Sequence, residues 1–243
     1  MGFFNDFFKK KEQAAVESKA EVKKEKKPRE YFNDDTELVF IIDRSGSMSG
    51  LEDDTIGGFN AMIEKQKSGE GRVYVSTVLF DNNSEVIHDR VDIKEIKPMT
   101  RSDYQVHGCT ALLDALGGAV SHIQSVHKYI RREDVPRHTI FVITTDGMEN
   151  ASHSYTSARV KEMIKSQTDD EGWEFMFLAA NIDAVETADS LGIRRERAAN
   201  YEYSRAGVER SYNAINESLC CLRESREKVD FDLSEVLRRV ENK

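Results

Sequence analysis

The sequence predicts an α/β protein with a mostly parallel central sheet and helices on both of its faces. Short apolar runs rich in β-branched residues alternate along the chain with segments whose apolar residues recur at helical spacing. Most of these runs are continuously apolar, which is typical of strands that are covered on both faces. Because strands that alternate with helices are joined by crossover connections, this order predicts parallel pairing.

The first expected strand is Glu37–Asp43, in which Leu, Val, Phe and two Ile precede an acidic residue. Two further strands are joined by a turn at Asn82 and Asn83, since asparagine is a common turn residue. We therefore expect one antiparallel edge strand in the sheet. In chain order, the remaining strands are expected at Arg72–Asp81, Glu85–Ile93, His138–Thr145, Trp173–Ala180 and Ala199–Tyr203.

Amphipathic segments between these strands predict the helices. The clearest one begins at Leu112 and ends near Ile130, with an apolar residue at almost every third or fourth position. Lys94–Gly108 has no such period and is expected to be a loop. The other expected helices are Ile56–Ile63, Ser157–Gln167, Ala184–Leu191, Val208–Leu222 and Leu233–Val240.

Charge and composition divide the chain into three parts. Residues 1–30 form a charged tail, helical or disordered, with nine Lys/Arg and six Asp/Glu. Residues 36–226 form the α/β domain, and residues 227–243 form a helical C-terminal extension. The whole chain has a net charge of −9, which disfavours a sequence-independent nucleic-acid binder, so no nucleic-acid partner is expected.

The tail carries a pattern of its own. Phe3, Phe4, Phe7 and Phe8 fall on one helical face and are followed at once by the basic run Lys9–Lys11. Aromatic residues beside a basic cluster resemble a short interfacial anchor, which predicts weak contact with an anionic membrane surface. A partner-docking peptide, a helix packed on the domain and simple disorder are the alternatives.

Cysteine usage and the absence of long apolar runs indicate a cytoplasmic protein. The three cysteines do not follow a zinc-binding spacing and are too few for a disulfide scaffold. No apolar run approaches the roughly 20 residues that a membrane span needs. The N-terminus also lacks the apolar core of a secretory signal.

Oxygen-bearing side chains follow the expected strands at three places. Asp43, Ser45 and Ser47 come after the first strand, Thr110 precedes the long helix, and Asp146 follows the strand 138–145. Ligands bind at the carboxyl ends of the strands in parallel α/β sheets, so these side chains are expected to converge. Carboxylate and hydroxyl oxygens suit Mg²⁺, Mn²⁺ or Ca²⁺ and not zinc.

The pattern Asp43-x-Ser45-x-Ser47, then Thr110, then Asp146 resembles the metal-ion-dependent adhesion site (MIDAS) of von Willebrand factor A (VWA) domains. The resemblance covers about 37–222, with Thr145-Asp146-Gly147 and Thr110-x-Leu112-x-Asp114 as supporting pieces. Cys109 departs from the family, which often has glycine there. The missing signal and disulfides make the chain similar to stand-alone cytoplasmic bacterial VWA proteins, including those linked to tellurium resistance.

The resemblance implies a Rossmann-like fold and a divalent cation at the upper edge of the sheet. It also implies a protein partner whose Asp or Glu completes the coordination of the metal, and a chain that is not an enzyme. The alternative is a Mg²⁺-dependent phosphohydrolase. Against that alternative, Ser45 stands where an aspartyl-phosphate enzyme needs its second Asp, and the chain has no phosphate-binding loop motif.

Overall fold

The computed structural model describes residues 31–69, 71–227 and 229–242. The predictions for the tail 1–30, including membrane contact through Phe3, Phe4, Phe7, Phe8 and Lys9–Lys11, lie outside these residues. Within the described ranges, no helix is both long and apolar enough to cross a membrane.

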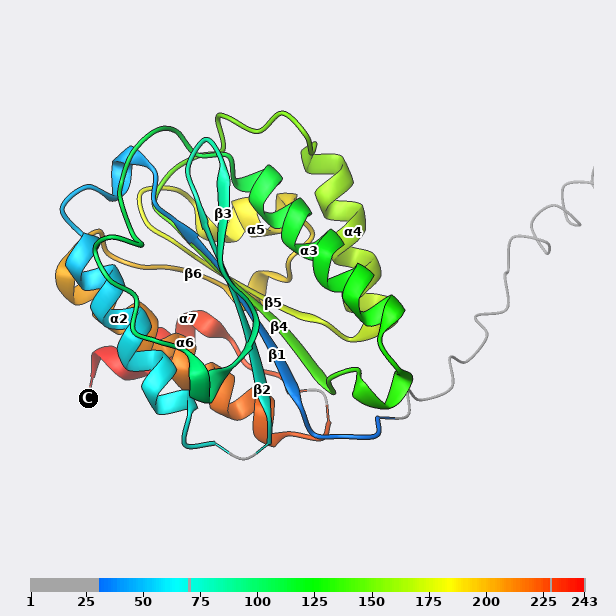
Figure 1. Ribbon diagram of the computed structural model, residues 1–243. Coiled ribbons are helices and arrows are strands. Elements are labelled where there is room, and N and C mark those ends of the chain that lie inside the picture. Colours follow the sequence, from blue (N-terminus) through cyan, green and yellow to red (C-terminus); the bar gives the residue numbers. More distant parts are fainter. Residues whose placement is uncertain (1–30, 70, 228, 243) are drawn as a thin grey trace, which may run out of the picture. The chain divides into compact units, whose positions relative to one another are not determined.

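A six-stranded sheet with the order β3-β2-β1-β4-β5-β6 forms the centre of the domain (Figure 1). β3 pairs with β2 in antiparallel fashion, and all the other neighbouring strands are parallel. The structure therefore confirms the predicted α/β class and the antiparallel edge strand. The strands are β1 (Thr36–Asp43), β2 (Val73–Phe80), β3 (Ser84–Asp92), β4 (His138–Thr145), β5 (Glu174–Ala179) and β6 (Ala198–Asn200).

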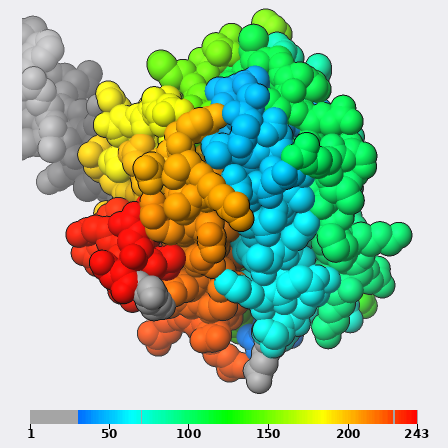
Figure 2. All heavy atoms as spheres, turned by 90° about the vertical axis from the view of Figure 1, so that its left-hand side faces the viewer, coloured from blue at the N-terminus to red at the C-terminus, as the bar shows by residue number. Residues whose placement is uncertain are grey.

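Among the described residues, three helices cover each face of the sheet. One face carries α3 (Leu112–Tyr129), α4 (Ser157–Glu171) and α5 (Ala184–Ser190). The opposite face carries α2 (Glu52–Gln66), α6 (Arg205–Glu224) and α7 (Leu233–Glu241). Figure 2 looks onto this second face and shows α2 and α6 side by side.

The alternation of side chains along β1 divides the apolar core into two halves. Leu38, Phe40 and Ile42 belong to the half beneath α2, α6 and α7, and Phe40 meets Phe59 edge-on with ring centroids 5.4 Å apart. Val39 and Ile41 belong to the half beneath α3, α4 and α5. Burying such side chains stabilises the fold by about 1.5–3 kcal/mol each, which explains why β1 is apolar on both faces.

The last strand differs from its prediction. The expected strand 199–203 is in fact β6, which begins at Ala198 and ends at Asn200. The Tyr201 N–H still donates to the Ala179 carbonyl at 2.9 Å. Two residues farther on, the Tyr203 hydroxyl donates to the carbonyls of Ser47 and Ser49 in the loop after β1. At the C-terminus, α7 packs on α6 and β6 and adds the fully buried Leu233 to the core.

Candidate metal centre

Asp43 lies at the carboxyl end of β1 and is completely buried. Its Oδ1 accepts a hydrogen bond from the backbone N–H of Ser45 at 2.7 Å, and its Oδ2 accepts one from the Thr145 hydroxyl at 2.5 Å. The Tyr104 hydroxyl donates to its backbone carbonyl. These contacts hold the carboxylate in one orientation at the edge of the sheet.

Ser45, Ser47 and Asp146 form a chain of oxygen atoms beside Asp43. The hydroxyls of Ser45 and Ser47 are 3.0 Å apart, and the Ser47 hydroxyl donates to Asp146 Oδ1 at 2.5 Å. The second oxygen, Asp146 Oδ2, is buried and accepts no hydrogen bond from any described residue. A buried carboxylate oxygen without a partner is costly, so this atom is expected to face a group that the protein itself does not supply.

Thr110 approaches the same cluster from the loop before α3. A methyl group built on Gly147 would lie 3.0 Å from Thr110 Oγ1 and 3.3 Å from Ser47 Oγ. The two hydroxyls therefore face the same small space beside Gly147. The fold brings together all of the predicted site residues, which are Asp43, Ser45, Ser47, Thr110 and Asp146.

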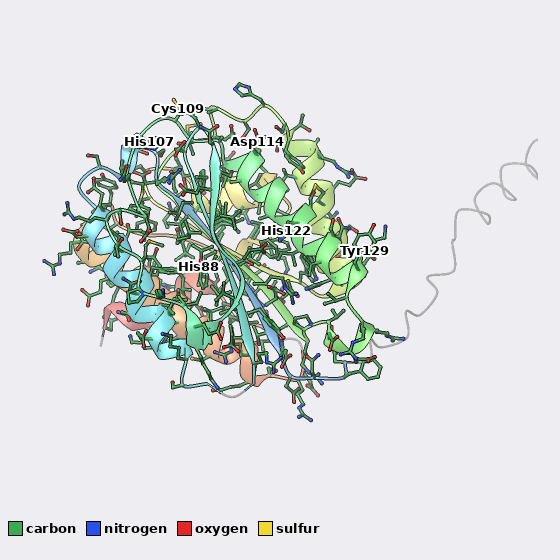
Figure 3. All side chains as sticks on the ribbon, in the orientation of Figure 1. His88, His107, Cys109, Asp114, His122 and Tyr129 are labelled. Carbon is green, nitrogen blue, oxygen red and sulfur yellow. The ribbon has the colours of Figure 1, made fainter. Side chains whose placement is uncertain are left out.

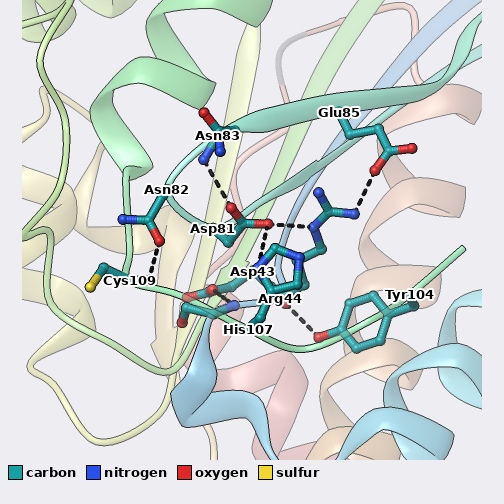
Figure 4. A network of polar contacts seen from close by, with 10 residues as sticks. Asp43, Arg44, Asp81, Asn82, Asn83, Glu85, Tyr104, His107 and Cys109 are labelled. Carbon is teal, nitrogen blue, oxygen red and sulfur yellow. Dashed lines mark hydrogen bonds and ion pairs between the residues drawn. The ribbon is translucent and has the colours of Figure 1, made fainter.

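The turn between β2 and β3, residues 81–83, holds in place the loop that carries Thr110, called the threonine loop below (Figure 4). Asn82 Oδ1 accepts from the backbone N–H of Cys109 at 2.8 Å, and the Asp81 carbonyl accepts from that of Ala111 at 2.8 Å. Both neighbours of Thr110 are thus tied to one turn. Gly108 allows this approach, since its φ is +72° and a Cβ there would lie 2.1 Å from Asn82 Oδ1.

An ion pair connects the same turn to the loop after β1. Arg44 Nε donates to the buried Asp81 Oδ2 at 2.7 Å, and its Nη1 donates to Glu85 at 2.6 Å (Figure 4). The Arg44 carbonyl accepts from the N–H of His107 at 3.0 Å. Arg44 and Asp81 therefore join the loop that carries the serines to the loop that carries the threonine.

The loop after β4 fixes the other side of Thr110. The Thr110 N–H donates to Asn150 Oδ1 at 2.9 Å, and the Asn150 N–H donates back to the Thr110 carbonyl at 3.0 Å. Glu149 Oε2 accepts from the N–H of Leu113 in the first turn of α3. Asp114 accepts from the backbone N–H groups of His153, Ser154 and Tyr155 in the same loop.

Sequence reasoning missed Asp81, Asn82, Glu149 and Asn150 as residues that position the site. The only signal was Asn82-Asn83, which predicted a turn but not what the turn holds. Each of the four side chains acts on a backbone group or a side chain of a distant loop. No residue spacing in the sequence reveals such a contact.

Burial governs the electrostatics of the two carboxylates. Desolvation raises the pKa of Asp43, although its hydrogen bond from Thr145 partly offsets this effect. Desolvation also raises the pKa of Asp146, and the neighbouring Asp43 charge adds to the shift, while the bond from Ser47 opposes it. A divalent cation would relieve both the burial of charge and the mutual repulsion.

The donor set consists of hard oxygens. Among the described residues, no group of three or more His, Cys, Asp or Glu side chains could hold a metal, so a cation here needs the hydroxyls as well as the two carboxylates. Figure 3 shows His107 and Cys109 at the end of the molecule near the site, while His88 and His122 lie farther along the fold. The chemistry of these residues fits a divalent cation that is held by oxygen ligands.

Comparisons with known proteins identify the fold. No family model matches the chain, and no curated protein is significantly similar to it. Among solved structures, it is similar to a von Willebrand factor type A protein from Catenulispora acidiphila (TM-score 0.52, 13% identity, 76% of this chain, 43% of that one). It is also similar to the vWF domain of a type V pili tip protein from Porphyromonas gingivalis (TM-score 0.54, 10% identity, 82% and 99%).

A third similar structure contains a metal. Proximal thread matrix protein 1 from the mussel byssus, with a zinc-occupied MIDAS motif, matches with a TM-score of 0.52 and 14% identity over 78% of this chain. The chain spans 47% of that protein's length and 43% of the Catenulispora protein's length. Likeness at these identities establishes the Rossmann-like fold of vWF type A domains.

Proposed function

We propose that the chain is a metal-dependent protein-interaction module that binds one divalent cation and, through it, a carboxylate of a partner protein. The observation that carries the proposal is Asp146 Oδ2, which is buried and unpartnered among the described residues, beside the hydroxyls of Ser45 and Ser47. A structural neighbour with metal in its MIDAS motif supports the same interpretation.

Mg²⁺ is the proposed cation, with Mn²⁺ or Ca²⁺ as substitutes. Asp43, Ser45, Ser47, Thr110 and Asp146 would hold it, directly or through water. Both oxygens of Asp43 already accept hydrogen bonds, so this residue contributes its charge and its remaining lone pairs. Two carboxylates neutralise the ion, and the three hydroxyls add no charge.

The partner carboxylate follows from the composition and exposure of this set. A cation with two acidic and three neutral ligands stays electrophilic enough to accept a further anionic oxygen, and Mg²⁺ takes about six oxygens. Ser47 is exposed, whereas Asp43, Ser45, Thr110 and Asp146 are buried, so the site opens to solvent on the side of Ser47. An Asp or Glu side chain of a partner can approach from that side.

Calorimetric titration with Mg²⁺ and Mn²⁺ tests the metal. We expect about one site per chain in the wild type and none in Asp43→Ala. Asp53→Ala is the matched control, because Asp53 is an exposed carboxylate paired with Arg101 on the surface. Binding by Asp43→Ala equal to that of the wild type would refute the assignment.

A Mg²⁺-dependent phosphohydrolase is the alternative, and we propose that the chain is not an enzyme. Ser45 stands where the second Asp of an aspartyl-phosphate enzyme would be, and its hydroxyl lies 3.0 Å from that of Ser47. Hydrolysis of p-nitrophenyl phosphate that requires both Mg²⁺ and Asp43 would favour the enzyme. The cytoplasmic location and the likeness to tellurium-resistance proteins are also proposals; three free thiols, Cys109, Cys220 and Cys221, support the location.

A further inference from the structure

Two large apolar side chains are exposed beside the metal centre. Met148 is 72% exposed and Tyr203 is 38% exposed, whereas nearly all other large apolar side chains of the described residues are buried or half-buried. The other exposed ones are Phe32, Val86 and Tyr129. Figure 3 places Tyr129 at the opposite end of α3 from Asp114 and the site.

Tyr203 is fixed to the loop that carries the two serines. Its hydroxyl donates to the Ser47 carbonyl at 2.7 Å and to the Ser49 carbonyl at 2.9 Å. The polar end of the side chain is thereby satisfied, and the ring is held over the loop with part of its face in solvent. An aromatic ring that is ordered before binding loses little conformational entropy when a partner covers it.

Met148 borders the site from the loop after β4. It lies two residues beyond Asp146, and the intervening Gly147 lines the space between the hydroxyls of Ser47 and Thr110. Methionine is unbranched and adapts its shape to an apolar partner group. Met148 and Tyr203 come from separate loops and belong to the surroundings of the same cluster.

Charged side chains near Met148 and Tyr203, which together form an apolar rim beside the site, limit the kind of partner that fits. The first turn of α2 contains Glu52, Asp53 and Asp54. Glu52 Oε2 accepts from the N–H of Gly50, in the loop after β1 that carries the two serines. Arg101 pairs with Asp53 and Arg205 with Asp54, so these carboxylates repel an acidic partner only in part. A single acid on the partner is enough to bind the cation. An apolar neighbour of that acid would cover the exposed rim.

We infer that Met148 and Tyr203 are specificity-determining residues, and that the partner segment presents one Asp or Glu next to a large apolar residue. This inference rests on the proposed function, because it supplies the neighbours of the carboxylate that the cation binds. The rim adds apolar contact area that metal coordination alone does not provide.

A random linear-peptide library, panned on the full chain in Mg²⁺ and eluted with EDTA, tests the inference. We expect enriched peptides to carry one acid with a large apolar residue beside it. A double variant, Met148→Ser with Tyr203→Ser, is expected to bind those peptides about tenfold more weakly. Both proteins are compared with the metal site saturated, as checked by calorimetry, because Tyr203→Ser also removes two bonds to the loop that carries the serines. A Phe32→Ser variant, changed at a distant exposed aromatic, should bind them like the wild type.

Other outcomes separate the two proposals. One such outcome is a set of enriched peptides that carry acids without an apolar neighbour, and another is a double variant that binds the peptides as tightly as the wild type. Either result would refute the role of Met148 and Tyr203 in specificity and would leave the proposal of a metal-dependent module intact. A pool with no EDTA-dependent enrichment would overturn both. A Mg²⁺-dependent dimer in sedimentation that the double variant loses would identify a second copy of the chain as the occupant and overturn the peptide inference.

Discussion

Asn82→Ala is expected to weaken metal binding although Asn82 is not a proposed ligand. Its side-chain oxygen accepts the N–H of Cys109 at 2.8 Å, directly before Thr110. The substitution removes this bond and leaves the backbone bond from Ala111 to Asp81 in place. The threonine loop then keeps one of its two hydrogen bonds to the turn at residues 81–83. The Thr110 hydroxyl is therefore held less firmly in the site.

The size of the effect follows from the kind of contact that is lost. Removing a side chain that orients a metal-site residue typically costs 10- to 100-fold in metal affinity. We expect about tenfold, the lower end, because the contacts of Thr110 with Asn150 remain. Unfolding free energy should fall by about 0.5–1 kcal/mol, since the lost hydrogen bond lies in an exposed turn.

Asn83→Ala is the matched control in the same turn. Asn83 uses its backbone N–H to reach Asp81 Oδ1 and its backbone carbonyl to accept from Asp81, and alanine keeps both groups. Mn²⁺ titration calorimetry gives the affinity, and urea denaturation in EDTA gives the stability. If Asn82→Ala and Asn83→Ala bind Mn²⁺ with the same affinity as the wild type, the turn does not position Thr110.

Two further perturbations act on Asp146 and Gly147. Burial, reinforced by the charge of Asp43, raises the pKa of Asp146. In EDTA, the folded chain therefore holds the carboxyl proton of Asp146 more tightly than the unfolded chain does. The stability that this proton provides is lost as pH rises through the raised pKa. By urea denaturation, Asp146→Asn should therefore be more stable than the wild type at neutral pH. The difference in unfolding free energy should shrink toward about pH 4. A variant that is less stable than the wild type at neutral pH would contradict this expectation. Gly147→Ala should reduce Mn²⁺ affinity about tenfold, because its methyl group would sit 3.0 Å from one site hydroxyl and 3.3 Å from another. Gly118→Ala, with open space around the new methyl group, should bind Mn²⁺ as the wild type does and gain about 1 kcal/mol of stability. If Gly147→Ala and Gly118→Ala bind Mn²⁺ with equal affinity, the space beside Gly147 is not the metal site.

Residue patterns predicted most of the secondary structure and the set of site residues. Apolar runs locate strands because a strand covered on both faces must be apolar throughout, as β1 is. Asp43, Ser45, Ser47, Thr110 and Asp146 could be grouped from strand order because parallel strands end at one edge of a sheet. The contact of Tyr203 just beyond β6 could not be predicted, because its partners lie in a loop more than 150 positions away in the chain.

The sequence by itself determined which oxygens are candidates for the metal centre, since side-chain type and the order of strands along the chain can be read from it directly. Tertiary structure alone decided how those oxygens are held. Asn82 reaches Cys109 across 27 positions, and Asn150 reaches Thr110 across 40. Tertiary structure also left Asp146 Oδ2 without a partner among the described residues and left Met148 in solvent. Hydrogen bonds between distant loops and the exposure of single side chains depend on the packed chain as a whole, and so they have no periodic signal in the sequence.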